Sequence, residues 1–110
     1  MDERGHETLT KARALLARPE HWTQGALARF APHGYATDVR DPKAKCFCVI
    51  GACLRSHHEE VNDPSWVLPL TTALIGWPTM DTALLSDFND DLETRHADVL
   101  ALFDKAIANG

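Results

Sequence analysis

Prolines and glycines interrupt this sequence at short intervals, and the stretches between them carry the apolar spacing of helices. Six prolines and six glycines are spread over 110 residues. In the first stretch, apolar residues three and four positions apart form the stripe of an amphipathic helix: Leu9, Ala12, Leu15 and Leu16. Pro19 disfavours helical geometry at Arg18, so this helix is predicted to end about there.

The stretch from Glu20 to Arg40 has no clean period and is punctuated by Gly25, Pro32 and Gly34. Such punctuation is typical of turns and loops. The stretch is predicted as an irregular wrap, with a short helix or an extended segment as the alternatives.

A sharp helix-start signal follows at Asp41 and Pro42. Aspartate caps the exposed N–H groups of a first turn, and proline suits the first helical position. A helix from Pro42 to about His57 is therefore predicted.

The same device recurs at Asp63 and Pro64. This helix is predicted to run to about Ile75 and to end at Gly76. Pro69 lies too deep for a first turn that begins at Pro64, which predicts a late start or a kink.

The remaining sequence predicts one more main helix. Residues 79–88 are expected to hold one or two helical turns and residues 89–94 a loop, after which Thr94 caps the last helix. The apolar face of that helix comprises Val99, Leu100, Leu102, Phe103, Ala106 and Ile107. Strand signals are weak. The predicted fold is all-α: one compact domain over residues 1–110, with about four main helices and an irregular segment after the first.

Charge and hydropathy restrict the function classes. The net charge is −5, and the basic residues are spread singly, whereas nucleic-acid-binding surfaces carry a basic stripe. The longest apolar run is too short for a membrane span, and the polar start is unlike a signal peptide. An odd number of cysteines argues against a secreted disulfide framework. These features predict a cytoplasmic protein that binds neither nucleic acid nor membrane.

All three cysteines lie between Lys45 and His58. On one helix Cys46 and Cys48 would point about 200° apart, and only Cys53 and His57 could share an ion. A structural zinc site needs four ligands, so no metal and no cofactor is predicted.

Burial explains these thiols better than chemistry does, because cysteine packs like a small apolar residue. A helical stripe is predicted from Cys46, Val49, Ile50, Cys53 and Leu54, with Gly51 and Ala52 allowing another backbone to approach closely. The alternative is a thiol nucleophile at Cys46, near Lys43 and Lys45.

Five polar or aromatic residues are candidates for a binding site: Trp22, Gln24, Arg29, Asn89 and Asp90. An aromatic ring, an amide and a guanidinium in a loop can face a ligand or a partner. The structural alternative is that Trp22, Gln24 and the Asn89–Asp90 pair form one hydrogen-bonded clasp. The acidic run at residues 87–93 resembles a calcium loop only in composition, because the glycine of that loop is missing.

Several motifs, taken in order, resemble a domain-of-unknown-function family of small bacterial and phage helical proteins. The pattern Trp-x-Gln-Gly-Ala begins at Trp22, Cys-x-x-Gly-Ala begins at Cys48, and Asn-Asp followed by Thr begins at Asn89. Family members often carry Cys where Thr23 stands here and Trp where Phe88 stands. The resemblance implies a compact helical domain and supplies no mechanism.

Two functional hypotheses remain, and neither names a catalytic residue. The first is a non-enzymatic protein-binding or regulatory module, related to phage or mobile elements, that binds a protein partner or itself. It predicts an exposed apolar patch including Trp66, Trp77 or Leu84. The alternative is a small enzyme or small-ligand binder with a site between the Trp22–Arg29 segment and the Asn89–Asp90 loop. It predicts a concave pocket lined by Trp22, Gln24 and Arg29.

Overall fold

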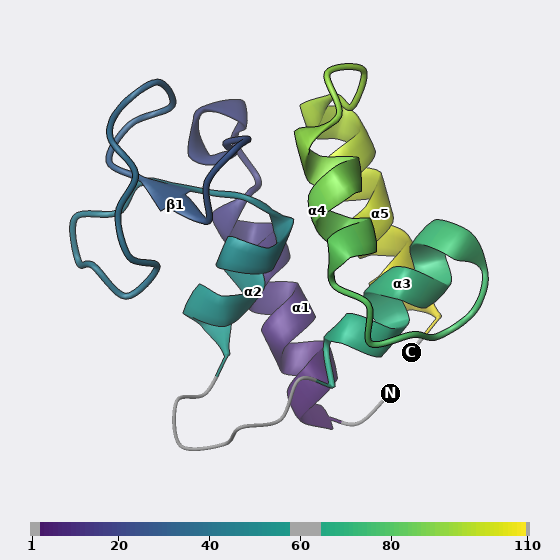
Figure 1. Cartoon of the computed structure of the whole chain (residues 1–110). Helices are drawn as coiled ribbons and strands as arrows, with labels where there is room; N and C mark the ends of the chain where they lie inside the picture. Colours follow the sequence, from purple (N-terminus) through teal and green to yellow (C-terminus); the bar gives the residue numbers. More distant parts are fainter. Residues whose placement is uncertain (1–2, 58–64, 110) are drawn as a thin grey trace.

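The computed structural model describes residues 3–57 and 65–109, and Figure 1 shows that they are mostly helical. The α-helices are α1 (Glu3–Leu15), α2 (Val49–Ser56), α3 (Val67–Ile75), α4 (Ala83–Asp90) and α5 (His96–Ala108). A 3-10 turn, η1 (Pro19–His21), and two short strands, β1 (Ala28–Arg29) and β2 (Cys46–Phe47), complete the described part. The helical fold class is confirmed in outline, with a fifth helix and a small antiparallel sheet in addition.

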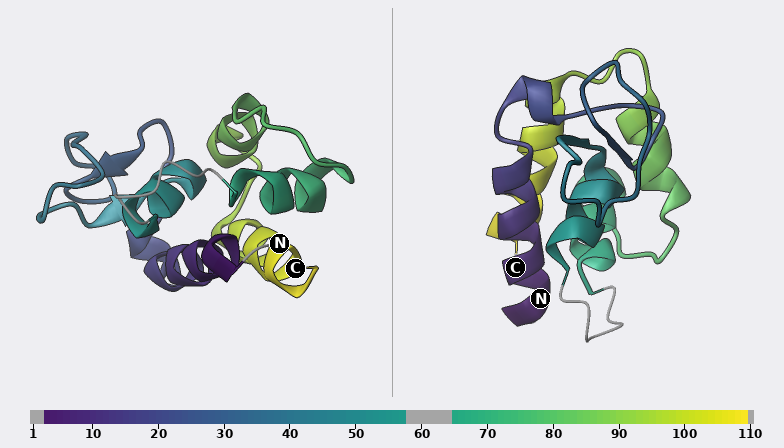
Figure 2. Two further views of the ribbon diagram at one scale, coloured as in Figure 1. Left: turned by 90° about the horizontal axis from the view of Figure 1, so that it is seen from below. Right: turned by 90° about the vertical axis from the view of Figure 1, so that its left-hand side faces the viewer.

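The helices form layers, which are clearest in Figure 2. The first and last helices, α1 and α5, lie side by side, and α2 and α3 pack on them. Helix α4 contacts α2 and α3 on their far side. The buried apolar side chains between the layers come from all five helices and both strands, and the largest that are fully buried are Phe103, Leu9, Leu16, Leu70 and Leu85.

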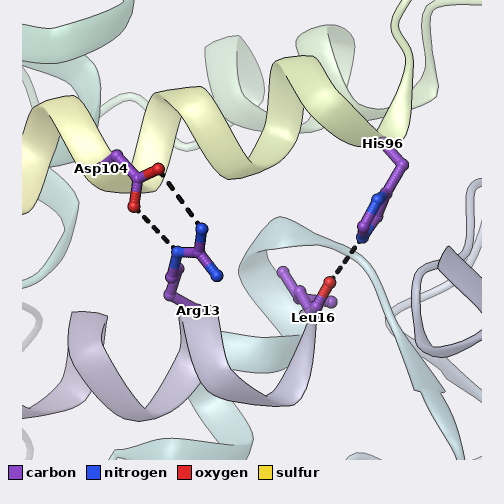
Figure 3. A network of polar contacts seen from close by, with 4 residues as sticks. All are labelled: Arg13, Leu16, His96 and Asp104. Carbon is purple, nitrogen blue, oxygen red and sulfur yellow. Dashed lines mark hydrogen bonds and ion pairs between the residues drawn. The ribbon is translucent and has the colours of Figure 1, made fainter. Parts of the chain in front are cut away.

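Two polar contacts join α1 and its C-terminal end to the antiparallel helix α5 (Figure 3). The Arg13 guanidinium donates two hydrogen bonds to the Asp104 carboxylate, from Nε to Oδ1 at 2.8 Å and from Nη2 to Oδ2 at 3.3 Å. These hydrogen bonds hold the pKa of Asp104 below its usual range and raise the pKa of Arg13. Three residues further along the chain, the Leu16 carbonyl oxygen lies 2.6 Å from His96 Nε2 at the start of α5. A carbonyl only accepts, so this ring nitrogen carries the proton.

The helix predicted from Pro42 to His57 is wrong in its first half. The Asp41 carboxylate accepts the Lys43 N–H at 2.8 Å, and the Asp41 carbonyl accepts the Ala44 N–H at 3.0 Å, which closes a single turn. The Lys45 N–H then donates to the Arg29 carbonyl at 2.9 Å, and β2 pairs with β1. Pairing with a distant strand therefore outweighs the local start signal. Helix α2 begins only at Val49.

Cys46 therefore lies in a strand, and the predicted helical stripe through it is wrong. The thiol of Cys48 instead caps α2, accepting the Gly51 N–H at 3.2 Å. All three cysteines are nevertheless buried and free, as predicted. The close approach predicted at Gly51 is also confirmed, because a Cβ there would overlap the Leu27 carbonyl.

Helix α3 ends as predicted, with Gly76 at φ 92° after Ile75. It starts late, at Val67, so that Pro69 falls within its first turn, as predicted. The start signal at Asp63 and Pro64 lies outside the described residues.

Two boundaries near the end of the chain differ from the prediction. Asn89 and Asp90 form the last turn of α4 and are not in a loop. Helix α5 is capped by the Asp98 carboxylate, which accepts the Arg95 N–H at 2.9 Å, and not by Thr94.

The longest described helices, α1 and α5, have 13 residues each. Within residues 3–57 and 65–109, no helix has both the length and the apolar character needed to cross a bilayer.

Candidate functional site

The Asn89 side chain lies at the centre of a hydrogen-bonded network and is 1% exposed. Its Oδ1 accepts the Trp22 indole N–H at 2.8 Å and the Val49 backbone N–H at 3.0 Å. Its Nδ2 donates to the Thr23 carbonyl at 3.1 Å and to Asp90 Oδ1 at 2.9 Å. Both N–H groups and both oxygen lone pairs are therefore used, which is full satisfaction for a primary amide.

Gln24 and Gly25 complete the connection between the irregular segment and α4. Gln24 Nε2 donates to the carbonyls of Asn89 and Asp91, each at 2.9 Å. The Gly25 N–H donates to Asp90 Oδ1, also at 2.9 Å. We call Trp22, Gln24, Gly25, Asn89 and Asp90 the clasp. The predicted contacts between the two segments are thus present. One of them, from Gln24 to the Asn89 carbonyl, satisfies a carbonyl at the end of α4 that no helical N–H reaches.

Arg29, in β1, forms hydrogen bonds with three other residues of the irregular segment. Its Nε donates to Thr23 Oγ1 at 3.1 Å, its Nη1 to the Gly34 carbonyl at 3.0 Å, and its Nη2 to the Gln24 carbonyl at 3.2 Å. A guanidinium has five N–H groups. One N–H on each terminal nitrogen therefore has no acceptor among the described residues, and Arg29 makes no ion pair there.

A cavity of about 530 Å³ opens beside the clasp. We call it the Trp22 pocket; it is lined by Pro19, Trp22, Thr23, Gln24, Arg29, Pro32 and His33. This size falls within the usual range of small-molecule sites. The indole of Trp22, half-buried here, also lies 6.2 Å from the imidazole of His96, centre to centre.

A smaller cavity, of about 170 Å³, borders the clasp as well. Its lining includes the Cys48 thiol and the Asp90 carboxylate. Burial, chiefly, and the charge of Asp90 raise the pKa of Cys48. Burial also raises the pKa of Cys46, and it raises that of Cys53 well above the usual value. A protonated thiol is a poor nucleophile, so the geometry gives no support to thiol catalysis at any of the three.

The described residues contain no group of three or more His, Cys, Asp or Glu side chains placed to hold a metal ion. The acidic run after α4 has other roles. The Asp91 carboxylate accepts the Glu93 N–H at 2.8 Å in a turn, and Asp98 caps α5.

All five candidate site residues come together in the fold. Asn89 and Asp90 lie at least 60 positions after Trp22, Gln24 and Arg29 in the sequence. Trp22, Gln24 and Arg29 line the pocket, while Asn89 and Asp90 support it from behind through the clasp. Sequence reasoning missed Pro19, Thr23, Pro32 and His33 as lining residues. The prolines were visible only as breaks in periodicity, and Thr23 contributes a backbone carbonyl and a hydroxyl that no side-chain pattern marks.

The patch proposed for a protein partner is only partly present. Trp66 is buried and Leu84 is half-buried, whereas Trp77 is 65% exposed. The chain after α3 folds back along it, because the Thr71 hydroxyl accepts the Thr79 N–H at 3.0 Å and lies 2.9 Å from the Thr79 carbonyl. Trp77 is therefore held at the end of α3.

Comparison with known proteins places the chain in a family but assigns no activity. Searches of the curated proteins and of the solved structures find no significant match. A family model described as a family of unknown function, DUF6197, matches residues 2–109. That match spans almost all of the sequence and confirms the expected membership of a family without established activity. The chain therefore belongs to DUF6197, a family of unknown function.

Proposed function

We propose that this chain is a binding module and that the Trp22 pocket receives a small molecule. The observation that carries the proposal is the pocket itself, because three residues singled out as ligand-facing, Trp22, Gln24 and Arg29, line one cavity of about 530 Å³. This corresponds to the small-ligand alternative derived from the sequence, in its non-enzymatic form.

The rigidity of the pocket wall supports a binding role. The indole N–H of Trp22 and the amide of Gln24 are held by the end of α4, and the Arg29 guanidinium is held at three of its nitrogens. Side chains fixed before a ligand arrives lose little conformational entropy on binding.

The proposal is tested by amide NMR on the whole chain, titrated with four small aromatic compounds: benzoate, benzamide, phenyl phosphate and phenol. We expect at least one of them to shift the backbone amides of Thr23, Gln24 and His33 together. His33→Ala should weaken that binding, whereas His6→Ala, an exposed histidine on α1, should not. If none of the four moves the pocket amides, the proposed function is wrong.

Self-association is a second candidate, and a specific surface favours it. Four of the eight large apolar side chains that are exposed in the described part lie on α3 or just after it: Leu68, Ile75, Trp77 and Met80. Residues 67–80 contain no charged side chain in a protein of net charge −5. Two copies can therefore meet at this surface without opposing like charges.

Light scattering after gel filtration, over a range of protein concentrations, tests this second candidate. We expect the average mass to rise with concentration and Trp77→Ser to abolish the rise. Tyr35→Ser is the matched control, because Tyr35 is an aromatic residue 87% exposed at another site. A parent protein that stays monomeric at every concentration rules out self-association.

A further inference from the structure

We infer that the ligand of the Trp22 pocket is a small organic anion, one that carries a carboxylate or phosphate beside a flat apolar group. This inference rests on the proposed function, since it names the chemical class that the same pocket would take. It depends on the charge of the lining, on unused donors and on the shape of the walls.

The lining of the pocket has the opposite charge from the protein as a whole. No carboxylate is among its seven lining residues, and Arg29 is a permanent cation there. The whole chain, by contrast, has 16 acidic and 11 basic residues. A cavity without acidic groups in an acidic protein concentrates positive potential where a ligand would enter.

Arg29 also has unused capacity to bind. Its three hydrogen bonds within the described residues go to a hydroxyl and two carbonyls, all of them neutral acceptors. Among residues 3–57 and 65–109, therefore, no carboxylate pairs with this charge, and one N–H on each terminal nitrogen lacks an acceptor there. A half-buried guanidinium with one N–H to spare on each terminal nitrogen has the donors that the oxygens of a carboxylate or phosphate require.

The fixed position of Arg29 strengthens this argument. A lone arginine on a surface must be ordered by its ligand, whereas this one is already ordered by Thr23, Gln24 and Gly34. The remaining walls suit the apolar part of such a ligand. Trp22, Pro19 and Pro32 present flat or rigid apolar faces around the cavity, and aromatic walls pack well against planar groups.

The test compares charged and neutral compounds of matched shape on the unmodified chain, by NMR titration or calorimetry. The pairs are benzoate with benzamide, and phenyl phosphate with phenol. We expect each anion to bind the pocket about tenfold more tightly than its neutral partner, as one charge-assisted hydrogen bond allows. The preference should shrink as KCl is raised. The tighter of the two anions tells whether a carboxylate or a phosphate is preferred.

Two outcomes separate this inference from the proposed function. If the neutral compounds bind as tightly as the anions, the pocket is a ligand site but the anion inference is wrong. If none of the four binds, the proposed function is wrong as well. Arg29→Gln should remove the preference for anions, and Arg18→Gln, outside the pocket, should preserve it. Should Arg29→Gln fail to fold, the matched pairs and the salt dependence on the parent still decide the question.

Discussion

At position 89 one buried amide meets four partners, two of them backbone groups from segments that are distant in the sequence. We predict that Asn89→Ala lowers the free energy of unfolding by about 3 kcal/mol, because it leaves an indole N–H, a backbone N–H and a carbonyl unpaired. Gln24→Ala should cost about 1 kcal/mol, because its two partner carbonyls lie nearer to solvent. Denaturant melts measure both.

The double variant and a surface control make this prediction decisive. Asn89→Ala and Gln24→Ala act on one network, so their combined cost should be less than the sum of the single costs. Asn109→Ala, at an exposed asparagine after α5, should have the same denaturation midpoint as the parent protein. Midpoints for both clasp variants within error of the parent would show that the clasp does not stabilise the fold.

The buried thiol of Cys53 gives a prediction in pH. Burial raises its pKa well above the usual value, so the folded state keeps the proton when the unfolded chain has lost it. Retention of this proton stabilises the folded state. Its contribution to the free energy of unfolding is complete below the thiol pKa of the unfolded chain, about 8.5, and is lost as pH rises above it. Denaturant melts should therefore show stability falling from about pH 8.5 upward. Cys53→Ala should flatten the fall, and unchanged slopes would contradict the assignment.

Reagent access supplies a second measurement on the same residues. The three cysteines are buried, so a thiol reagent should label native protein slowly and denatured protein at once. Fast labelling of all three in the native protein would contradict their burial.

At the scale of elements, α2 and the Leu27 backbone meet so closely that only glycine fits at position 51. Gly51→Ala should destabilise the protein by about 3 kcal/mol, even though alanine favours helices by about 1 kcal/mol. Gly76→Ala is the matched comparison. Gly76 has φ 92° but open space around its Cβ position, so the cost there should be about 1 kcal/mol. Equal costs in thermal or denaturant melts would mean that the backbone near Leu27 yields.

The ion pair between α1 and α5 should contribute little despite its geometry. The Arg13 and Asp104 side chains are 34% and 58% exposed, and pairs with such exposure are worth about 0.5 kcal/mol. A double-mutant cycle with Arg13→Gln and Asp104→Asn should return a coupling of about that size, and it should vanish at high salt. A coupling several times larger would show that the pair holds the two helices together.

Local sequence signals predicted which helices form better than they predicted the residues at which those helices begin and end. The apolar stripe at Leu9 and the glycine stop at Gly76 each depend on neighbours in the chain, and both predictions are confirmed. The start predicted at Pro42 failed because β2 hydrogen-bonds with β1, which lies 18 residues earlier. The residues next to Pro42 in the sequence do not reveal that this segment pairs with a distant strand.

At the scale of the whole molecule, the site could be predicted by residue type but not by geometry. Asn89 and Gln24 were identifiable as side chains that bind backbone groups, and their contacts are present. The ligand hypothesis predicted a pocket lined by Trp22, Gln24 and Arg29, but the rest of its lining was not predictable, because its walls combine η1, β1 and the turn around His33. These elements acquire a common face only when the chain has folded.

The neighbouring first and last helices have a consequence for biosynthesis. Of the described helices, α1 is synthesised first, yet one of the two helices that contact it most, α5, is synthesised last. The apolar face of α1, which includes Leu9 and Ala12, must therefore wait through nearly the entire translation of the domain before it is fully covered. A chain halted at Thr94 should accordingly be degraded rapidly by added protease, whereas the chain that continues through Asn109 should resist it. We therefore expect the core of this domain to be completed only after α5 has been synthesised.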